Sequence, residues 1–531
     1  MMAAEGTGNR MTTRRLVNRP GTSEGLVFMF GLLVAVLGGA VVAGAIRFPL
    51  GSELPVGVSV LTLCFLGTLP LLLGQWRLTA LLLLVWLILE DLFRKFAGND
   101  IRVYFVKDLI FVALIAGVLA AREVRGVWKR AAGKERLLLY AMVAWAVVLS
   151  IPTGMRDWRL PLIGLRLNFM YIPLVAVGFL LASDMTGFRT WLRRMSVVAG
   201  IASAVGVAQA ALGPQFLSPD RATPGLTNLV LIRGTAESGA IYRPTGTFVD
   251  PGRFVSIAFV GLAVALAAAL ANRDDRGGGR RKIHGLVVLS SLACGAGVWV
   301  SGGRAALLGA LFVLAFVVVS PFFGERRFAT VGRTSGRAFV LVISIVVAVA
   351  AISPILISSR SDWYRQTLDL RSSDNEWSSR FDSYWTDTVR GVTLGGLFGQ
   401  GTGQESLGRQ YIFGGDQRLA AGIQVEGGYA SVAVEWGGVG LALWLLWTVT
   451  WSRRLWMSVK SAKGTPLSAP GLVLIGWIVF FLFIGFFSGL QNYQNYIANA
   501  FFWLLSGMVF ALPKIVVAQE SHVASELTHA T

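Results

Sequence analysis

Ionisable side chains within apolar segments are the residues of this chain best suited to chemistry, because a charge inside a membrane is costly and usually marks a function. Arg166, Arg253 and Arg304 each lie in the first turns of an apolar segment, and all three segments are predicted to enter the membrane from the same side. Taken singly, each charge also fits a snorkelling side chain or a local ion pair near the interface. Their shared side favours a polar cavity that opens outward. The full set is Glu90, Asp91, Lys107, Asp108, Arg166, Arg253, Arg304 and Glu435.

The chemistry that suits such a cavity is transfer of a group from a lipid-linked pyrophosphate. The lipid tail stays in the outer leaflet, and the charged headgroup needs cationic partners. When a sugar–phosphate bond breaks, negative charge grows on the leaving pyrophosphate, and preorganised guanidinium groups stabilise that charge more than the ground state. Arginine presents a planar fork that fits phosphate oxygens, whereas lysine offers a point charge.

The sequence predicts neither a metal nor another cofactor. No Asp-x-Asp motif lies in a segment predicted to face outward, and Asp274-Asp275 lies in a predicted cytoplasmic loop. The two cysteines fall inside apolar segments, and the three histidines form no pair that could bind zinc or complete a catalytic triad. Metal-independent chemistry is therefore expected.

The elements that must position these residues are transmembrane helices. Hydrophobic residues make up 54% of the chain and charged residues 15%, whereas a soluble domain is roughly 25% charged. Apolar runs of transmembrane length predict an all-α polytopic membrane protein with about fourteen spans. The predicted spans are 26–46, 55–74, 77–93, 103–121, 137–152, 163–182, 192–212, 253–271, 285–301, 304–322, 338–358, 428–451, 470–489 and 494–512.

Charge in the connecting segments predicts the orientation. Basic loops alternate with less basic ones along the chain, and basic loops face the cytoplasm. Both termini are then cytoplasmic, with tails 1–25 and 513–531 on either side of a single transmembrane domain, 26–512. Two large segments of that domain, 213–252 and 359–427, are external. The same rule accounts for the formal net charge of +19, so no nucleic-acid partner is implied.

The second external segment is one long loop that we interpret as a working surface. A multi-span protein rarely keeps so long a polar insert without use, because ordering it costs conformational entropy. Phe381, Trp385 and Val389 recur at helical spacing, which predicts partial helix over Trp377–Val389, packed on the membrane domain. The segment contains no lysine, and its arginines are Arg360, Arg365, Arg371, Arg380, Arg390, Arg409 and Arg418.

Short motifs follow one another between Gly164 and Leu445. They are Gly164-Leu-Arg166, Arg243-Pro-Thr-Gly246-Thr-Phe248 before Asp250-Pro-Gly, Ser301-Gly-Gly-Arg304-Ala-Ala, Ser379-Arg380-Phe-Asp-Ser-Tyr-Trp385, Gly399-Gln-Gly401-Thr-Gly403, Glu426-Gly-Gly-Tyr429 and Glu435-Trp-Gly437-Gly-Val-Gly440. No single motif is specific. Their serial order, with a long external loop before the last spans, resembles the bacterial O-antigen ligase and O-antigen polymerase family.

The resemblance implies transfer of a glycan from an undecaprenyl-pyrophosphate carrier to an acceptor sugar hydroxyl. The reaction would take place at the outer face of the bacterial cytoplasmic (inner) membrane. Carried over by position, Arg243, Arg304 and Arg380 would bind or stabilise pyrophosphate, with Arg166 and Arg253 as further candidates. The implied partners are the lipid-linked oligosaccharide donor, the glycan acceptor and membrane lipid, with a chain-length regulator or other envelope-assembly proteins as candidate partners.

Glu426 stands where ligases of the family resemble one another in carrying a histidine. This departure favours a polymerase of surface polysaccharide repeats, or a ligase with another acceptor. As the catalytic base, the Glu426 carboxylate could accept the proton of the acceptor hydroxyl, but capping of the following helix suits an acidic residue equally well. Arg380 could instead pair with Asp374, Glu376 or Asp382. Trp385 could stack on sugar rings or pack in the core, and Glu435 fits a structural hydrogen-bonding residue.

Two other classes of function stay open. A transporter or flippase of lipid-linked saccharides should show paired repeats and broken helices near the midplane, and the sequence indicates neither. A non-catalytic scaffold for envelope assembly should tolerate the loss of Arg304 or Arg380.

Overall fold

The computed structural model describes most of the chain from residue 74 onward. The described residues are 74–96, 101–121, 126–155, 157–213, 216–217, 232–235, 239–271, 285–319, 360–361, 363–364, 376–407, 409 and 425–530. They fall within one folded unit, Leu72–Thr531.

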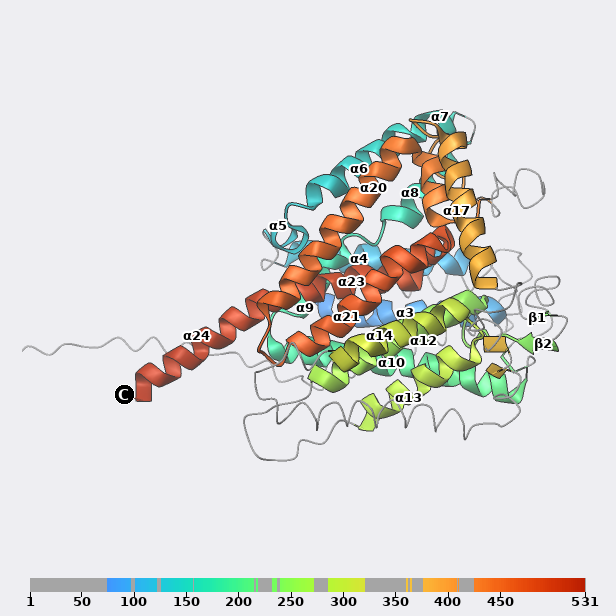
Figure 1. Cartoon of the computed structure of the whole chain (residues 1–531). Helices are drawn as coiled ribbons and strands as arrows, with labels where there is room; N and C mark the ends of the chain where they lie inside the picture. Colours follow the sequence, from blue (N-terminus) through green and yellow to red (C-terminus); the bar gives the residue numbers. More distant parts are fainter. Residues whose placement is uncertain are drawn as a thin grey trace, which may run out of the picture. The chain divides into compact units, whose positions relative to one another are not determined.

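Helices form nearly all of the regular structure in these residues, which confirms the all-α class (Figure 1). Eight of the described helical stretches are long and apolar enough to cross a membrane. They are Val103–Ala120 (with α4, Val106–Ala120), Arg136–Gly154 (α6, Arg136–Val148, and α7, Ser150–Gly154), Arg159–Leu181 (α8, Arg159–Phe169, and α9, Leu174–Leu181), Met185–Leu212 (α10), Pro251–Ala271 (α12), Gly428–Ser461 (α20), Ser468–Gly485 (α21, Ser468–Phe480, and the π-helical η4, Phe481–Gly485) and Tyr496–Ser521 (α23, Tyr496–Phe510, and part of α24, Leu512–Ala530).

The other described elements are shorter, more polar or more charged. They are α3 (Trp76–Phe96), the 3-10 helix η1 (Ile101–Phe105), α5 (Val127–Ala132), β1 (Ile232–Thr235), β2 (Gly239–Tyr242), α13 (Gly285–Val300), α14 (Arg304–Val319), α17 (Glu376–Gly395) and α22 (Leu490–Gln494). Three of them, α3, α13 and α14, match predicted spans. The predicted spans 26–46, 55–74 and 338–358 lie outside the described residues, except for Gly74, so the total of about fourteen spans stays a prediction.

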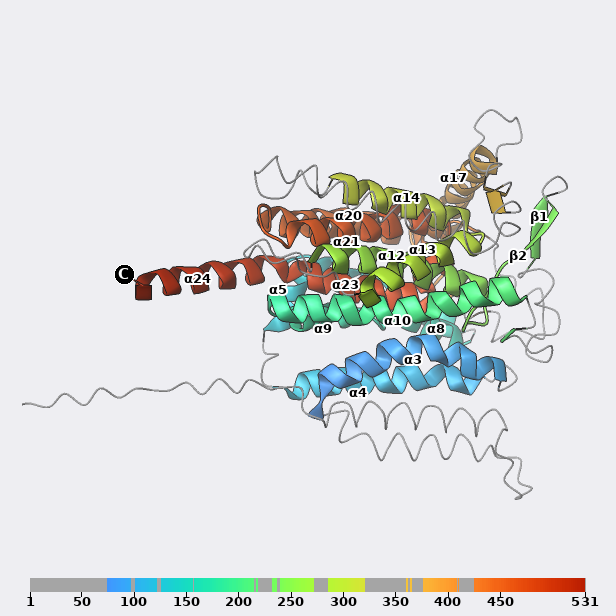
Figure 2. The same cartoon turned by 90° about the horizontal axis from the view of Figure 1, so that it is seen from below.

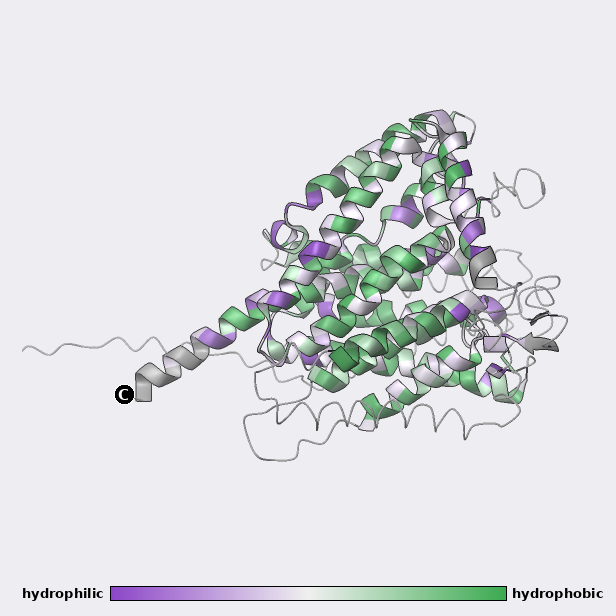
Figure 3. Ribbon diagram, in the orientation of Figure 1, coloured by the Kyte–Doolittle hydropathy of each residue, from purple (hydrophilic) through white to green (hydrophobic). Residues whose placement is uncertain are grey.

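Small residues allow the central helices to approach closely. A methyl group at Gly261 of α12 would lie 2.6 Å from the Cβ atom of Ala199 in α10 and 2.7 Å from Sγ of Cys294 in α13. Glycine at this position therefore lets three helices meet, as small residues commonly do in membrane proteins. Figure 2 shows α10, α12 and α13 side by side, and Figure 3 shows that apolar residues cover most of α12, α14 and α21.

A short hairpin interrupts the helical pattern within segment 213–252. Strands β1 and β2 pair antiparallel, with Ile232 opposite Tyr242 and Thr235 opposite Gly239. No strand was predicted here from the sequence. The hairpin lies beyond the ends of α12 and α13 in both views (Figures 1 and 2).

Helix α17 confirms the predicted helix over Trp377–Val389 and extends it to Gly395. It runs steeply across the direction of α12, α14 and α21 (Figure 1), and Figure 2 shows it nearly end-on. Gly391 and Gly395 meet the backbone of the first turns of α20, where a methyl group would collide with Ala430 and Ala433.

The predicted packing of the Phe381, Trp385 and Val389 stripe on the membrane domain holds for Phe381 alone, whose ring centre lies 5.4 Å from that of Phe487 just beyond η4. All three side chains are more than half exposed. The contact with α20 is made by the glycine face of α17, which leaves Trp385 and Val389 on a different side of the helix. Core packing of Trp385, one of its two interpretations, is therefore excluded.

The glycine motif after α17 packs between helices, although the whole segment 359–427 was predicted to be external. The amide of Gly401 donates to the Glu435 carbonyl of α20 at 3.0 Å, and the amide of Thr402 donates to the Leu149 carbonyl at 3.2 Å. The Thr402 hydroxyl also donates to the Ala146 carbonyl of α6 at 2.7 Å. The insertion is possible because alternate residues have no Cβ atom and adopt φ values of +83° to +113°. The residues in this conformation are Gly399, Gly401 and Gly403.

Substitution of Gly403 by alanine is expected to destabilise the fold more than the same change at Gly464. Both glycines have a left-handed φ, +93° at Gly403 and +86° at Gly464, so each variant incurs backbone strain of about 1 kcal/mol or more. At Gly403 the new methyl group would also lie 2.3 Å from the Leu160 carbonyl oxygen, whereas at Gly464 it would meet nothing within 4 Å. Thermal unfolding of both purified variants measures the difference. Equal unfolding temperatures would show that the close contact with α8 has no energetic weight.

Candidate functional site

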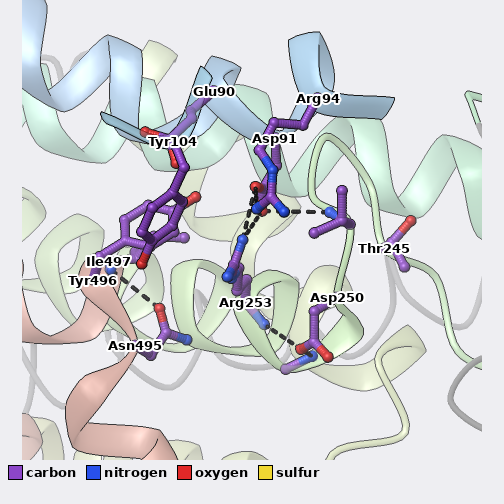
Figure 4. Close-up of polar contacts among 12 residues, drawn as sticks. Glu90, Asp91, Arg94, Tyr104, Thr245, Asp250, Arg253, Asn495, Tyr496 and Ile497 are labelled. Atoms are coloured by element: carbon purple, nitrogen blue, oxygen red, sulfur yellow. Dashed lines mark hydrogen bonds and ion pairs between the residues drawn. The ribbon is translucent and has the colours of Figure 1, made fainter. Parts of the chain in front are cut away.

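One end of the helix bundle collects the charged residues that the sequence places inside predicted spans. Arg253 in the first turn of α12 contacts Asp91 near the end of α3 (Figure 4). The start of α14 joins them, because Gly303 packs against Val255 of α12. The described residues therefore place these charges at one end of the bundle, as predicted. Which side of a membrane that end faces stays a prediction.

Asp91 is the centre of a buried ion-pair network. Its carboxylate accepts hydrogen bonds from Nη1 of Arg94 at 3.0 Å and from Nη1 of Arg253 at 2.7 Å. The amide of Val249 donates to the same carboxylate at 3.4 Å. Asp91 is fully buried. These donors therefore replace the hydrogen bonds to water that an ionised carboxylate loses on burial.

Two further ion pairs complete the network. Nζ of Lys107 lies 2.9 Å from Oε1 of Glu90, and Nη2 of Arg166 lies 2.6 Å from Oδ2 of Asp108. The Arg166 guanidinium also lies 4.8 Å from the ring centre of Tyr104, a cation–π distance. The local ion-pair interpretation of these charges is thus confirmed, and an open polar cavity here stays a prediction. The ion-pair network consists of Glu90, Asp91, Arg94, Lys107, Asp108, Arg166 and Arg253.

The segment before α12 connects this network to a second group of cations. Nζ of Lys95 donates to the Thr245 hydroxyl and to the Gly246 carbonyl, each at 2.7 Å. Oε1 of Gln209 in α10 accepts from the amides of Thr245 at 2.8 Å and Gly246 at 2.6 Å. Arg243 is two residues away from this anchored turn, so its Cα atom lies within about 7 Å of that of Thr245.

Arginines from three separate segments gather around the turn between α13 and α14. Nε of Arg243 donates to the Ser301 carbonyl at 3.4 Å. The guanidinium of Arg304, the first residue of α14, lies 3.8 Å from the ring centre of Trp363. Nε1 of Trp363 in turn donates to the Gly302 carbonyl at 3.1 Å, which ties the tryptophan to the same turn. We call Arg243, Arg304 and Arg360 the arginine group.

Arg360 is the most deeply buried member of this group, with 2% of its surface exposed. Its Nη2 donates to the Tyr242 carbonyl. Its Nε and Nη1 have no hydrogen-bond partner among the residues that the structure describes. Burial lowers the pKa of Arg360, but a guanidinium stays protonated in proteins. A buried cation with unused donors calls for an anion or ordered water.

Neutral donors surround this cation. The Tyr242 hydroxyl and Nε1 of Trp299 are also buried without a hydrogen-bond partner in the described part of the chain. Burial raises the pKa of Tyr242 and of Tyr364 to about 12, so both hydroxyls keep their protons at neutral pH. The Tyr364 hydroxyl donates a hydrogen bond to the Trp299 carbonyl at 2.9 Å. The arrangement offers donors to an anion, which is the chemistry of a phosphate site.

Arg380 and Glu426 form an exposed pair at the start of α20. Nη1 of Arg380 lies 3.3 Å from Oε2 of Glu426, and the Glu426 amide donates to Oδ2 of Asp387 at 3.0 Å. Arg380 therefore pairs with a carboxylate, but its partner is Glu426, which was not among the three carboxylates predicted to pair with it. Trp385 lies exposed on the same helix, α17.

The candidate residues therefore fall into three groups at this end of the bundle. Arg166 and Arg253 belong to the ion-pair network, Arg243 and Arg304 to the arginine group, and Arg380 contacts Glu426. Convergence of Arg243, Arg304 and Arg380 in one pocket stays a prediction.

Glu435 is a structural hydrogen-bonding residue, as expected. It is buried in α20, and its Oε1 accepts from the Glu405 amide at 2.8 Å. It thus anchors the end of the glycine motif. Two residues later α20 is interrupted at Gly437, which adopts φ +68°, and the amide of Gly438 donates to the Gly396 carbonyl at 2.9 Å.

Arg360 had no predicted role of its own. It was one of seven arginines in the external segment, and composition did not separate it from the others. The signal that could have singled it out is its place directly after the predicted span 338–358. Trp363 and Tyr364 follow at helical spacing and put aromatic surface beside it.

No protein-family model matches this chain, and no curated protein matches it in sequence. The resemblance to O-antigen ligases and polymerases therefore rests on the motifs alone, and the activity that it implies is a proposal.

Proposed function

We propose that the chain is a metal-independent membrane glycosyltransferase with about fourteen spans. It transfers a glycan from an undecaprenyl-pyrophosphate carrier to an acceptor sugar hydroxyl at the outer face of the bacterial cytoplasmic membrane. Polymerisation of surface polysaccharide repeats is the favoured reaction. Attachment of a finished polymer to another acceptor is the alternative within the same chemistry.

The observation that carries the proposal is the arginine group. Arg243 donates to a carbonyl of the α13–α14 turn, and Arg304 stacks on Trp363, which is bonded to the same turn. Arg360 donates to the carbonyl of Tyr242, the residue before Arg243, and has buried donors that the described residues do not use. A pyrophosphate has many acceptor oxygens and needs several planar donors at once. The apolar helices around the group would keep the lipid tail of the same donor in the bilayer.

The proposed step forms a bond between the acceptor hydroxyl oxygen and the anomeric carbon of the donor glycan. The bond from that carbon to the pyrophosphate oxygen breaks, and the lipid pyrophosphate leaves with the bonding electrons. The hydroxyl proton passes to a base, for which Glu426 is the candidate. The arginine group would hold the leaving pyrophosphate as its charge increases, which lowers the barrier.

Transport of a lipid-linked saccharide is the second candidate function. The interruption of α20 at Gly437 and the glycine motif inserted beside it form a broken helix, a feature of transporter binding sites. The sequence had indicated no such break. Transport would use the arginine group to bind the same headgroup without breaking a bond.

The purified protein in vesicles with a fluorescent lipid-linked repeat separates these functions. A polymerase is expected to produce a ladder of longer glycans on the lipid, while a transporter would move the repeat across the bilayer at unchanged length. In cells, deletion of the gene should leave single capped repeats on an electrophoresis gel. Full-length polymer stranded on its carrier would instead identify a ligase.

A further inference from the structure

The outer face of α17 carries an apolar stripe that the proposed reaction does not use. Phe381, Trp385, Val389 and Val392 are between 41% and 59% exposed. Their spacing places them along one line of the helix. Single exposed apolar residues are ordinary, but a continuous stripe indicates a contact surface.

The remaining two faces of α17 show how the helix is held. Gly391 and Gly395 on one face pack against the backbone of α20. Asp382, Thr386 and Arg390 on the opposite side are exposed and polar. The apolar stripe lies between these faces. A helix with an apolar side next to a polar side is typical of a helix lying in a membrane interface.

The stripe continues into the surface of a membrane-length helix. The ring of Phe398, just beyond α17, lies 6.2 Å from the ring of Trp145 in α6. The same helical stretch, Arg136–Gly154, exposes Val148 and Ile151 near its end. If this stretch crosses a bilayer, those side chains contact acyl chains, and Phe398 extends that contact to α17.

The direction of α17 and its neighbours agree with this position. Figure 1 shows α17 running across the direction of the membrane-length helices, as a helix in the plane of the interface would. Trp158, which precedes α8, and Trp385 of α17 are both largely exposed. Tryptophan is enriched at the level of lipid headgroups.

We propose that α17 is an interfacial helix whose stripe contacts bilayer lipid through Trp385, Val389 and Val392. Phe381, at the start of the stripe, also packs against the ring of Phe487 at 5.4 Å and so joins the stripe to the membrane domain. The polar face of α17 then points to water and headgroups. The inference requires only that the helices span a membrane, and it does not depend on the transfer reaction. It gives α17 a mechanical role, because the helix fixes the depth of Arg380 and of the inserted glycine motif.

Spin labels on single cysteines test the proposal in the whole protein. In a Cys64→Ser/Cys294→Ser background, Val389→Cys and Val392→Cys report on the stripe, and Thr386→Cys and Thr393→Cys report on the polar side of the same helix. Each protein is labelled with a nitroxide and placed in phospholipid nanodiscs. Collisions with lipid-soluble oxygen and with a water-soluble nickel chelate are then compared, with Val449→Cys of α20 as the reference for lipid exposure.

The stripe positions are expected to give an oxygen-to-nickel ratio several-fold above that of Thr386→Cys and close to that of Val449→Cys. A ratio at the stripe equal to that of Thr386→Cys would overturn the proposal, and it would leave Trp385 available to stack on sugars. Protection from both reagents would overturn it too, because protein would then cover the stripe. Two labels on each side keep the test valid if one variant fails to fold.

Discussion

Replacing Arg304 by lysine is expected to remove most of the proposed transfer activity, although the positive charge is kept. The Arg304 guanidinium lies 3.8 Å from the ring centre of Trp363 at the first residue of α14. Lysine cannot reproduce the planar stack or a two-pronged contact to phosphate. Loss of one preorganised donor to a developing anion lowers a rate by roughly 100- to 1000-fold. Initial rates of glycan extension by purified protein in vesicles measure the effect.

Arg159→Lys is the matched control for this variant. Arg159 is the exposed first residue of α8, and its guanidinium lies 2.7 Å from the Asp157 carboxylate. The same chemical change there should leave the rate unchanged, since an exposed ion pair contributes little. A normal rate for Arg304→Lys, in protein with a normal unfolding temperature, would argue against direct contact of Arg304 with pyrophosphate.

The membrane-length helices could be predicted from the sequence because hydropathy and length are local properties. The eight long apolar stretches of the described part all coincide with predicted spans. The fate of α17 could not be predicted in the same way. Periodicity revealed its apolar stripe, but the contact with α20 is made by Gly391 and Gly395, whose role is visible only when the neighbouring backbone is known.

The glycine motif shows the same limit. Gly399, Gly401 and Gly403 are compatible with a flexible external turn, and their spacing alone has no specific meaning. In the structure each one allows a close backbone approach, to α20, to α7 and to α8 respectively. The absence of a Cβ atom matters because of the helix that each glycine contacts. Two of these helices, α7 and α8, lie hundreds of residues earlier in the sequence.

The charged residues were predicted to share one side, and this followed from the alternation of helix directions. Their pairing did not follow, because it depends on which helix ends are neighbours. Asp91 of α3 and Arg253 of α12 are 162 residues apart in the sequence, yet they share two hydrogen bonds. The resulting network explains why Arg166 and Arg253 are weaker candidates for phosphate than Arg360, whose described contacts include no carboxylate.

Substitution of Asp91 by alanine is expected to cause the largest loss of stability of any single change at this end of the bundle. The variant removes the shared acceptor of Arg94 and Arg253, both of which lie largely inside the protein. Removing one partner of a buried ion pair lowers the free energy of unfolding by about 3–5 kcal/mol, because the remaining charge is left uncompensated. Thermal and denaturant unfolding of the purified protein in detergent measure this loss.

A second substitution separates the electrostatic cause from simple loss of packing. In Asp91→Ala/Arg253→Met one of the uncompensated charges is gone, so part of the stability should return relative to the single variant. The ion pair of Arg159 with Asp157 provides the control, because Arg159 is exposed. Asp157→Ala should therefore change the unfolding temperature little. If the double variant were less stable than Asp91→Ala, the network would stabilise the fold mainly through packing. The clustering of cations around Asp91 would then need another explanation, such as binding of an anionic headgroup.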